Sequence, residues 1–173
     1  MKPVLLLSVL LCAAFAAPVE EEQKPAETAQ EVQTAETADV QGPAVRFNFC
    51  SEGWFMYESR CFRFFNTPLS WYDAEEQCNS LGGHLASVSN PRQYSFLQQM
   101  TQTAGQTIAW LGGFNLQGRW LWIDREGFYY TNWSSQLTAS GNPCIFLNSA
   151  TGWSNRPCTS NQRFICSKNA FGC

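Results

Sequence analysis

Cysteine and histidine are the residues whose numbers most directly limit the chemistry of this chain. The 173 residues include eight cysteines but only one histidine, His84. One histidine excludes a metal site built from several histidines and argues against a histidine-based catalytic triad. Asp124 and Glu126 could form a pair of catalytic carboxylates in principle, but no histidine or second site group accompanies them in the sequence. We therefore predict that the protein is not an enzyme.

Residues 1–16 have the pattern of a secretory signal peptide. Lys2 precedes an apolar run over residues 4–11, and Ala14-Phe15-Ala16 matches an A-x-A cleavage signal. A transmembrane anchor would need about 20 apolar residues, but Pro18 and three glutamates follow too soon. We predict cleavage after Ala16, secretion, and no insertion into a membrane. The thiols then meet an oxidising environment.

Cleavage would remove Cys12 and leave an odd number of cysteines. The seven that remain are Cys50, Cys61, Cys78, Cys144, Cys158, Cys166 and Cys173. Three bridges would leave one thiol over, and an odd cysteine in a secreted protein suggests a bond between chains. Counting does not identify that cysteine. Any of the seven could be the unpaired one, and the other six can pair in 15 ways, which gives 105 arrangements.

Charge and composition divide the rest of the chain near residue 46. Residues 18–45 hold seven acids, one base and no aromatic residue. Such a segment buries too little apolar surface to fold, so we predict a disordered acidic leader over residues 17–46, with a shielding propeptide as the alternative. Residues 46–173 hold 24 of the 25 aromatics, seven acids and nine bases. This composition predicts one domain over residues 47–173, and its lack of a basic stripe argues against a nucleic acid partner.

Two helices are expected early in that domain. Ser70 and Asp73 form a capping pattern, and Trp71, Ala74, Cys78 and Leu81 follow on one helical face before Gly82-Gly83 ends the helix. The second helix should begin at Asn90-Pro91, with a capping residue and then proline at the first helical position. Asp73, Glu75 and Glu76 would form a solvated acidic face of the first helix.

The later part of the domain reads as short strands joined by loops. The strand candidates are residues 62–65, 108–111, 120–123, 144–147 and 163–166. Because the helices come first and most strands follow, the class is α+β rather than alternating α/β. Residues 132–143 form a long polar connection, which is where binding sites usually lie on a disulfide-held domain.

A series of tryptophan, glycine and cysteine motifs runs in order through residues 50–166. The series is Cys50-x-x-Gly53-Trp54, Cys61-Phe62, Trp71-x-x-Ala74-x-x-x-Cys78, Gly82-Gly83-His84-Leu85-Ala86, Trp110-Leu111-Gly112-Gly113, Trp120-x-Trp122-x-Asp124, Asn132-Trp133, Cys144, Gly152-Trp153, Cys158 and Phe164-Ile165-Cys166. In type and order these motifs resemble the long form of the C-type lectin-like domain. With its acidic leader, the whole chain is similar to small secreted fish lectins of skin and venom, a group related to type II antifreeze proteins.

The resemblance implies two helices packed on short antiparallel sheets, a long loop region and three intrachain disulfides. By the family pairing these bridges are Cys50–Cys61, Cys78–Cys166 and Cys144–Cys158. Cys173 then becomes the odd cysteine, at the exposed C-terminus. We predict that it forms an interchain disulfide in a homodimer. A thiol capped by a small molecule is the alternative.

Sugar-binding members of the family hold Ca²⁺ with a loop motif, Glu-Pro-Asn or Gln-Pro-Asp, and with a later Trp-Asn-Asp motif. In this sequence the first motif falls on Leu137-Thr138-Ala139, or on Gln136-Leu137-Thr138 after a shift of one residue, and the second falls on Trp153-Ser154-Asn155. No Asp or Glu lies between Gly127 and Cys173. Because ligand charge sets much of the affinity for Ca²⁺, we predict no cofactor and no functional calcium at this place.

Sugars can also bind by direct hydrogen bonds and by stacking on aromatic rings. The candidate carbohydrate-binding residues are Gln136, Thr138, Asn142, Ser154, Asn155 and Arg156. The resemblance to lactose-binding fish-skin relatives implies a calcium-independent, galactose- or lactose-type lectin that agglutinates cells in innate defence, with cell-surface or microbial glycans as partners. Two alternatives stay open: a sugar-inactive domain that binds a protein, and an ice-binding protein.

Overall fold

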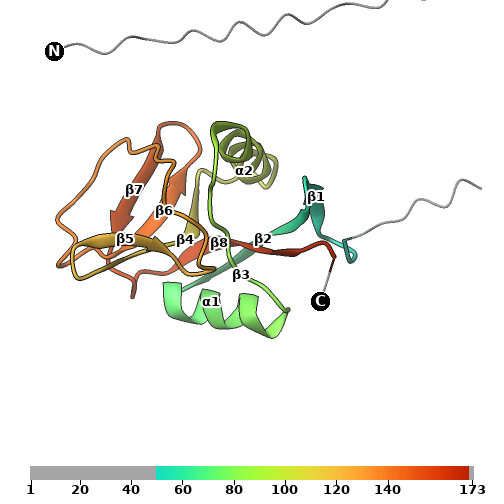
Figure 1. Cartoon of the computed structure of the whole chain (residues 1–173), viewed down its shortest axis with the longest axis horizontal. Helices are drawn as coiled ribbons and strands as arrows, with labels where there is room; N and C mark the ends of the chain where they lie inside the picture. Colours follow the sequence, from blue (N-terminus) through green and yellow to red (C-terminus); the bar gives the residue numbers. More distant parts are fainter. Residues whose placement is uncertain (1–49, 172–173) are drawn as a thin grey trace, which may run out of the picture. The chain divides into compact units, whose positions relative to one another are not determined.

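The computed structural model describes residues 50–171 (Figure 1). The predicted signal peptide, the acidic leader and Cys173 lie outside these residues. No helix within residues 50–171 is long and apolar enough to cross a membrane. The elements in chain order are β1 (Phe55–Tyr57), β2 (Arg60–Leu69), α1 (Trp71–Ser80), β3 (His84–Leu85), α2 (Pro91–Thr103), β4 (Ile108–Leu116), β5 (Arg119–Trp122), β6 (Cys144–Asn148), β7 (Gly152–Arg156) and β8 (Gln162–Asn169).

The strands form one connected sheet with the order β1-β2-β8-β4-β6-β7, while β3 pairs with β8 and β5 pairs with β4. The α+β class is confirmed, but the sheet is mixed rather than purely antiparallel. The last strand, β8, enters between β2 and β4 and runs parallel to β4 where Trp110 pairs with Phe164. The fold therefore brings the two ends of the domain side by side, since β2 and β8 pair along most of their lengths.

Both helices begin at the residues that the capping patterns predict. The Ser70 side chain accepts a hydrogen bond from the Asp73 backbone N–H, and the Asn90 side chain accepts one from the Gln93 N–H. Each bond satisfies one of the backbone donors that a helix N-terminus leaves without an intrahelical partner. Pro91 stands at the first helical position of α2, as expected.

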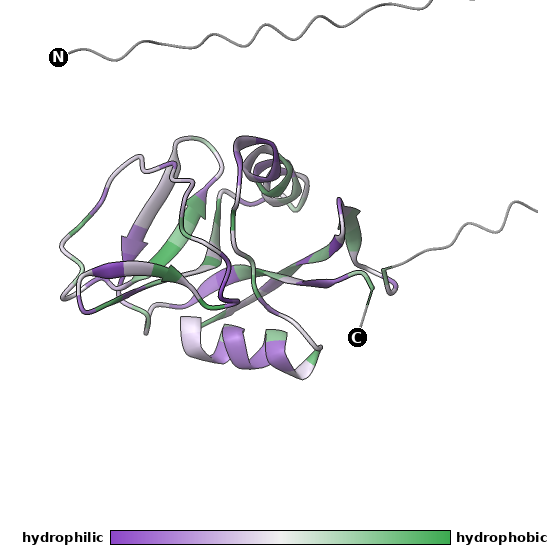
Figure 2. Ribbon diagram, viewed as in Figure 1, coloured by the Kyte–Doolittle hydropathy of each residue, from purple (hydrophilic) through white to green (hydrophobic). Residues whose placement is uncertain are grey.

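The helices cover two separate parts of the core. Buried side chains of α1 join a cluster that contains Leu85, Trp110, Phe164 and the Cys78–Cys166 bridge. Buried side chains of α2 join a second cluster with Ile145 and Trp153. Figure 1 shows α1 and α2 on opposite sides of the β2–β8 pair, and Figure 2 shows a mainly hydrophilic α1 and a strongly hydrophobic β6. The apolar strands thus supply most of the core, and each helix contributes one face.

The three disulfides are those that the family pairing implied: Cys50–Cys61, Cys78–Cys166 and Cys144–Cys158. Cys78–Cys166 fastens α1 to β8, and Cys144–Cys158 closes the β6–β7 hairpin from the start of β6 to the residues after β7. The five expected strand segments all fall on or overlap observed strands. The patterns did not indicate β1 and β7, because β1 has only three residues and Gly152–Arg156 contains two polar side chains that are buried.

The interpretation of the α1 acidic face as simply solvated is wrong for Glu75. Its side chain is 12% exposed, and its carboxylate accepts a hydrogen bond from the Leu85 N–H at 2.8 Å. The same carboxylate lies 2.6 Å from His84 Nδ1 and accepts from the Asn79 side-chain amide at 2.8 Å. Glu75 therefore joins α1 to β3, and the only histidine of the chain has a structural partner.

Candidate functional site

The long connection between β5 and β6, residues 123–143, is held to the domain near both of its ends. Its first part is fixed by Asp124, whose side chain is only 4% exposed. The carboxylate accepts hydrogen bonds from Ser87 Oγ at 2.5 Å and from Arg60 Nη2 at 3.0 Å. Glu126, which is half exposed, also contacts Arg60 at 3.2 Å. The two carboxylates that could have formed a catalytic pair thus share one arginine and anchor the loop.

Asn155 on β7 holds the second part of the connection. Its side chain is fully buried and makes three hydrogen bonds to loop backbone. Oδ1 accepts from the Leu137 N–H at 2.7 Å, while Nδ2 donates to the Leu137 carbonyl at 3.0 Å and to the Asn142 carbonyl at 2.6 Å. Because Leu137 N–H can only donate and the two carbonyls can only accept, this pattern fixes the orientation of the amide. We call these three bonds the Asn155 clasp.

The neighbours of Asn155 on β7 also use their polar atoms within the protein. Ser154 is 9% exposed, and its hydroxyl lies 2.9 Å from the Ser135 hydroxyl. The Arg156 guanidinium lies over the Phe146 ring at 3.9 Å and faces the side-chain amide of Gln162. Burial lowers the pKa of the Arg156 guanidinium below its ordinary range. Ser154 and Asn155 therefore stabilise the loop, and neither presents a free polar group to solvent.

Next to the residues of the clasp, the loop and the β4–β5 hairpin turn border an open depression of about 540 Å³. The residues that line it are Asn115, Gln117, Gly118, Thr138, Ala139, Ser140 and Pro143. The turn is held against the loop by a hydrogen bond from the Asn115 N–H to the Pro143 carbonyl at 2.7 Å. Gln117 and Gly118 both have positive φ, 50° and 83°, which is typical of a tight two-residue hairpin.

The six residues proposed from the sequence therefore separate into two groups. Thr138 lines the depression and is exposed, Gln136 is exposed on the same loop, and Asn142 is half-buried with its amide donating to the Thr138 carbonyl at 3.2 Å. Ser154, Asn155 and Arg156 lie in β7 behind the loop. Sequence reasoning missed Asn115, Gln117 and Ser140, although the Asn-x-x-Gly pattern at 115–118 marks a turn that could have been considered.

An aromatic cluster supports the β7 side of the loop. Trp153 is fully buried, and its ring lies 5.9 Å from Trp133 and 5.6 Å from Tyr130. Burial raises the pKa of Tyr130, and likewise that of Tyr94 on α2, above the ordinary value of 10.0. Trp153 is thus a core residue, as the resemblance implied, and Trp133 is partly buried against it. Neither tryptophan lines the depression.

Two helices on a mixed sheet, three disulfides at these positions and a long loop held beside β7 define a C-type lectin-like domain. The family described as "Lectin C-type domain" matches residues 67–168, and the chain belongs to this family. Ladderlectin of Oncorhynchus mykiss is 40% identical over 155 residues, which cover 84% of this chain and 82% of that protein.

The chain is also similar to a galactose-specific lectin and to an antifreeze protein. The galactose-specific lectin nattectin of Thalassophryne nattereri is 32% identical over 128 residues, which cover 69% of this chain and 80% of nattectin. A solved structure of a Ca²⁺-dependent type II antifreeze protein in its Ca²⁺-free form superposes with a TM-score of 0.65 at 33% identity, covering 69% of this chain and all of that one. The proteins to which this chain is similar thus include both lectins and antifreeze proteins.

Proposed function

We propose that this chain is a secreted lectin that binds galactose-type sugars without calcium, and that the sugar occupies the depression between the β4–β5 turn and residues 138–143. The observation that carries the proposal is the Asn155 clasp, which shapes the loop by hydrogen bonds alone. The names of ladderlectin and of the galactose-specific lectin nattectin support carbohydrate binding of this class.

The donor set around the clasp does not suit a calcium ion. Ca²⁺ is bound by six to eight oxygen ligands, and carboxylates among them set much of the affinity. The loop offers the neutral carbonyls of Leu137 and Asn142, and both already accept hydrogen bonds from Asn155. The Asn155 amide turns its NH₂ group toward these carbonyls, so the place where a cation would need an oxygen holds a hydrogen-bond donor.

The depression has the mixture of groups that a small sugar requires. Asn115, Gln117, Thr138 and Ser140 carry side-chain donors and acceptors, while Ala139 and Pro143 offer apolar surface for the less polar face of a pyranose. Gln136 is a candidate for contacts outside the depression. An open, solvated site of this kind binds one sugar weakly, so useful avidity requires more than one site per particle.

Bivalence would come from a disulfide-linked homodimer through Cys173. Two sites on one dimer could then bridge glycans on neighbouring cells or microbes, which suits an agglutinating role in innate defence. The signal peptide pattern supports secretion, and the absence of a catalytic constellation in the proposed site supports a binding role rather than catalysis.

Retention on immobilised lactose and mannose, each measured with calcium and with a chelator, tests the proposal. We expect retention on lactose in the presence of chelator and elution by free lactose. Gln117→Ala and Thr138→Val should each weaken lactose binding about fivefold, the equivalent of about 1 kcal/mol for one hydrogen bond. Thr159→Val, an exposed threonine that does not line the depression, is the matched control. Retention that disappears with chelator would contradict the proposal.

Ice binding is the second candidate, because the fold superposes on a type II antifreeze protein at 33% identity. Thermal hysteresis of the purified protein together with no retention on sugar would favour it. A protein that shows neither activity would instead fit a lectin-like domain that binds a protein partner.

A further inference from the structure

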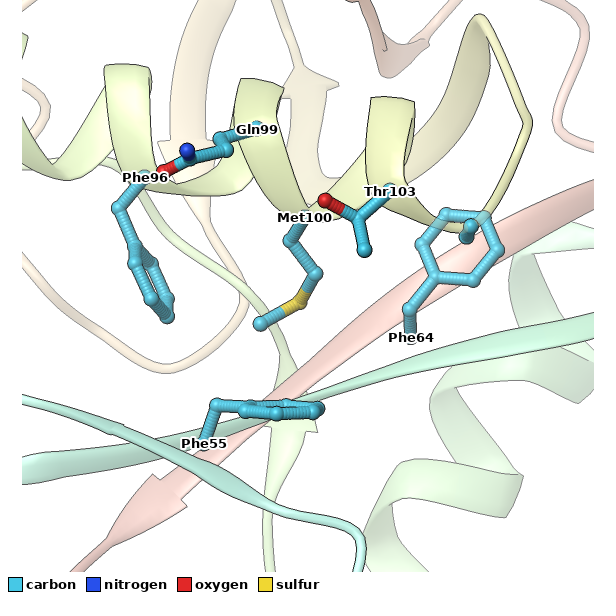
Figure 3. A pocket seen from close by; sticks show the side chains of 7 residues that line it. Phe55, Phe64, Phe96, Gln99, Met100 and Thr103 are labelled. Atoms are coloured by element: carbon cyan, nitrogen blue, oxygen red, sulfur yellow. The ribbon is translucent and has the colours of Figure 1, made fainter.

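An apolar groove lies at the end of the domain that carries β1, between α2 and the β1–β2 hairpin. It has a volume of about 340 Å³ and is lined by Phe55, Phe64, Phe96, Gln99, Met100, Thr103 and Ala104. Figure 3 shows Phe96 and Met100 extending from α2 toward Phe55 on the opposite wall. Nothing in the proposed sugar site uses this groove, and its lining contains no charged residue.

Phe55 is the most exposed of the groove residues that β1 and β2 supply. It pairs with Phe62 on β2, so both side chains stand on the α2 face of the hairpin. Phe62 is fully buried and lies 5.5 Å from the Phe96 ring, whereas Phe55 is 60% exposed. Its neighbour Met56 is 45% exposed. Two adjacent large apolar side chains on a three-residue edge strand are a feature that soluble proteins usually avoid or cover.

Among the described residues, β1 pairs with β2 and with no other strand. Its second edge therefore offers backbone donors and acceptors next to the groove. Such an edge can accept one more antiparallel strand, whose alternate side chains would then reach the groove.

The C-terminus leaves the domain at this same end. Asn169 pairs with Arg60, and the Ala170 N–H donates to the Ser59 carbonyl at 2.9 Å, beside the turn that joins β1 to β2. Cys173 follows Phe171 by two residues, a reach of about 7 Å. A disulfide between two copies of Cys173 adds about 6 Å, so it would keep the two Phe171 Cα atoms within about 20 Å of each other. Any dimer linked in this way must bring two β1 ends together.

We propose that the partner for this groove is a second copy of the chain, bound through β1. The two β1 strands run antiparallel about a two-fold axis at Met56, and each Phe55 lies beside Tyr57 of the partner and enters the partner's groove. A two-fold arrangement is self-complementary and closes at two copies. The contact forms without the disulfide, and Cys173 then makes it permanent.

This arrangement also fixes where the proposed sugar sites point. Figure 1 shows β1 at one end of the domain and β5, β6 and β7 at the other. A dimer that joins two β1 ends leaves both depressions at its far extremities. The β1 contact uses no residue of the proposed sugar site, so dimer formation and sugar binding can be lost separately.

Sedimentation equilibrium of the secreted chain carrying Cys173→Ser separates the groove contact from the disulfide. We expect reversible dimers that Phe55→Asp weakens at least tenfold. Tyr72→Asp is the matched control, since Tyr72 is an aromatic residue of nearly equal exposure, 59%, on α1. Gln99→Glu places a charge on the groove wall from an exposed α2 position and should weaken the dimer as well, without disturbing a packed side chain.

Circular dichroism and thermal melting show whether each variant is folded. A Cys173→Ser protein that stays monomeric at about 0.5 mM would overturn the proposal. So would dimers that Phe55→Asp and Gln99→Glu leave as tight as Tyr72→Asp does. Lactose retention measured on the same samples distinguishes a failure of the dimer from a failure of the proposed sugar site.

Discussion

At the scale of single residues, the one buried amide of Asn155 holds the second part of the long loop against β7. Three hydrogen bonds from one side chain reach two places in the loop, Leu137 and Asn142. Removing a partner from buried backbone groups costs about 1–3 kcal/mol for each group that is left unsatisfied, unless water enters. The loop conformation is therefore coupled to one position on β7.

Replacing Asn155 with leucine keeps the side-chain volume but removes all three bonds. We expect a loss of about 2–3 kcal/mol in the free energy of unfolding, less than the full cost of three unsatisfied groups, because water can reach the half-exposed Leu137. Hydrogen exchange should become faster across residues 134–143. Asn161→Leu, at an exposed position in the connection between β7 and β8, is the control and should change neither measurement. Unchanged exchange in the loop of the Asn155 variant would show that the clasp does not hold it.

The sequence located this position but not its role. Trp153-Ser154-Asn155 stands at the place of the family's second ligand motif, which predicts that its polar residues face a sugar. A strand sequence does not reveal which polar side chains satisfy loop backbone, because the partners at 137 and 142 lie 18 and 13 residues away. Whether an asparagine is buried becomes evident only when the position of the loop that it holds is known.

At the scale of elements, the long connection depends on a second anchor at its start. Asp124 reaches Ser87 in the segment before α2 and Arg60 at the start of β2. These two partners belong to parts of the chain 37 and 64 residues away. The anchor ties three segments together, so its loss should affect the domain more than the loss of an ordinary surface charge.

Asp124→Asn and Glu126→Gln compare the two carboxylates that contact Arg60. Removing the charge of the buried Asp124 should cost about 2 kcal/mol, because Ser87 and Arg60 then donate to a neutral amide instead of a carboxylate. The half-exposed Glu126 should cost under about 1 kcal/mol. Urea denaturation at neutral pH measures both. Equal losses would mean that the burial of Asp124 does not matter.

The close approach of β4 and β3 depends on a glycine. A Cβ atom at Gly112 would lie 2.4 Å from the Leu85 carbonyl oxygen, which is backbone and cannot move aside easily. We expect Gly112→Ala to destabilise the fold by about 3 kcal/mol. Gly141→Ala is the control, since open space surrounds that position and the change should stay within about 0.5 kcal/mol. Thermal melting of the two variants gives the comparison.

The elements with strong local signals were predictable from the sequence. The caps at Ser70 and Asn90 fixed where both helices begin, and apolar runs located the five main strand segments. The short strand β3 was implied only by the family resemblance. The position of β8 between β2 and β4 depends on the topology of the whole sheet, which local patterns do not show. The depression was not predictable either, because it forms where a turn at 115–118 meets a loop more than 20 residues later.

At the scale of the whole molecule, the disulfides differ in how much of the chain they restrain. Cys78–Cys166 closes a loop of 88 residues, and Cys50–Cys61 closes one of 11. In the chain-entropy treatment these loops correspond to about 5 and about 3 kcal/mol respectively. The long bridge also joins α1 to the central strand β8, so it acts across the core rather than at the edge.

Replacing each cysteine pair with alanine should reveal this difference. We expect the Cys78→Ala/Cys166→Ala protein to lose about 2 kcal/mol more than the Cys50→Ala/Cys61→Ala protein. Chemical denaturation of both proteins provides the free energies. Equal losses would indicate that strain or residual structure in the unfolded chain, rather than loop length, decides the effect.

The Asn155 clasp has a consequence for where the protein can work. A neutral amide does not titrate and binds no exchangeable ion, so neither acidification nor depletion of divalent cations acts on the three bonds of the clasp. A receptor whose binding loop is closed by an ion can release its cargo in an acidic compartment and be used again. In the secreted lectin proposed above, a loop closed by an asparagine would lack that release step and would keep its ligand bound.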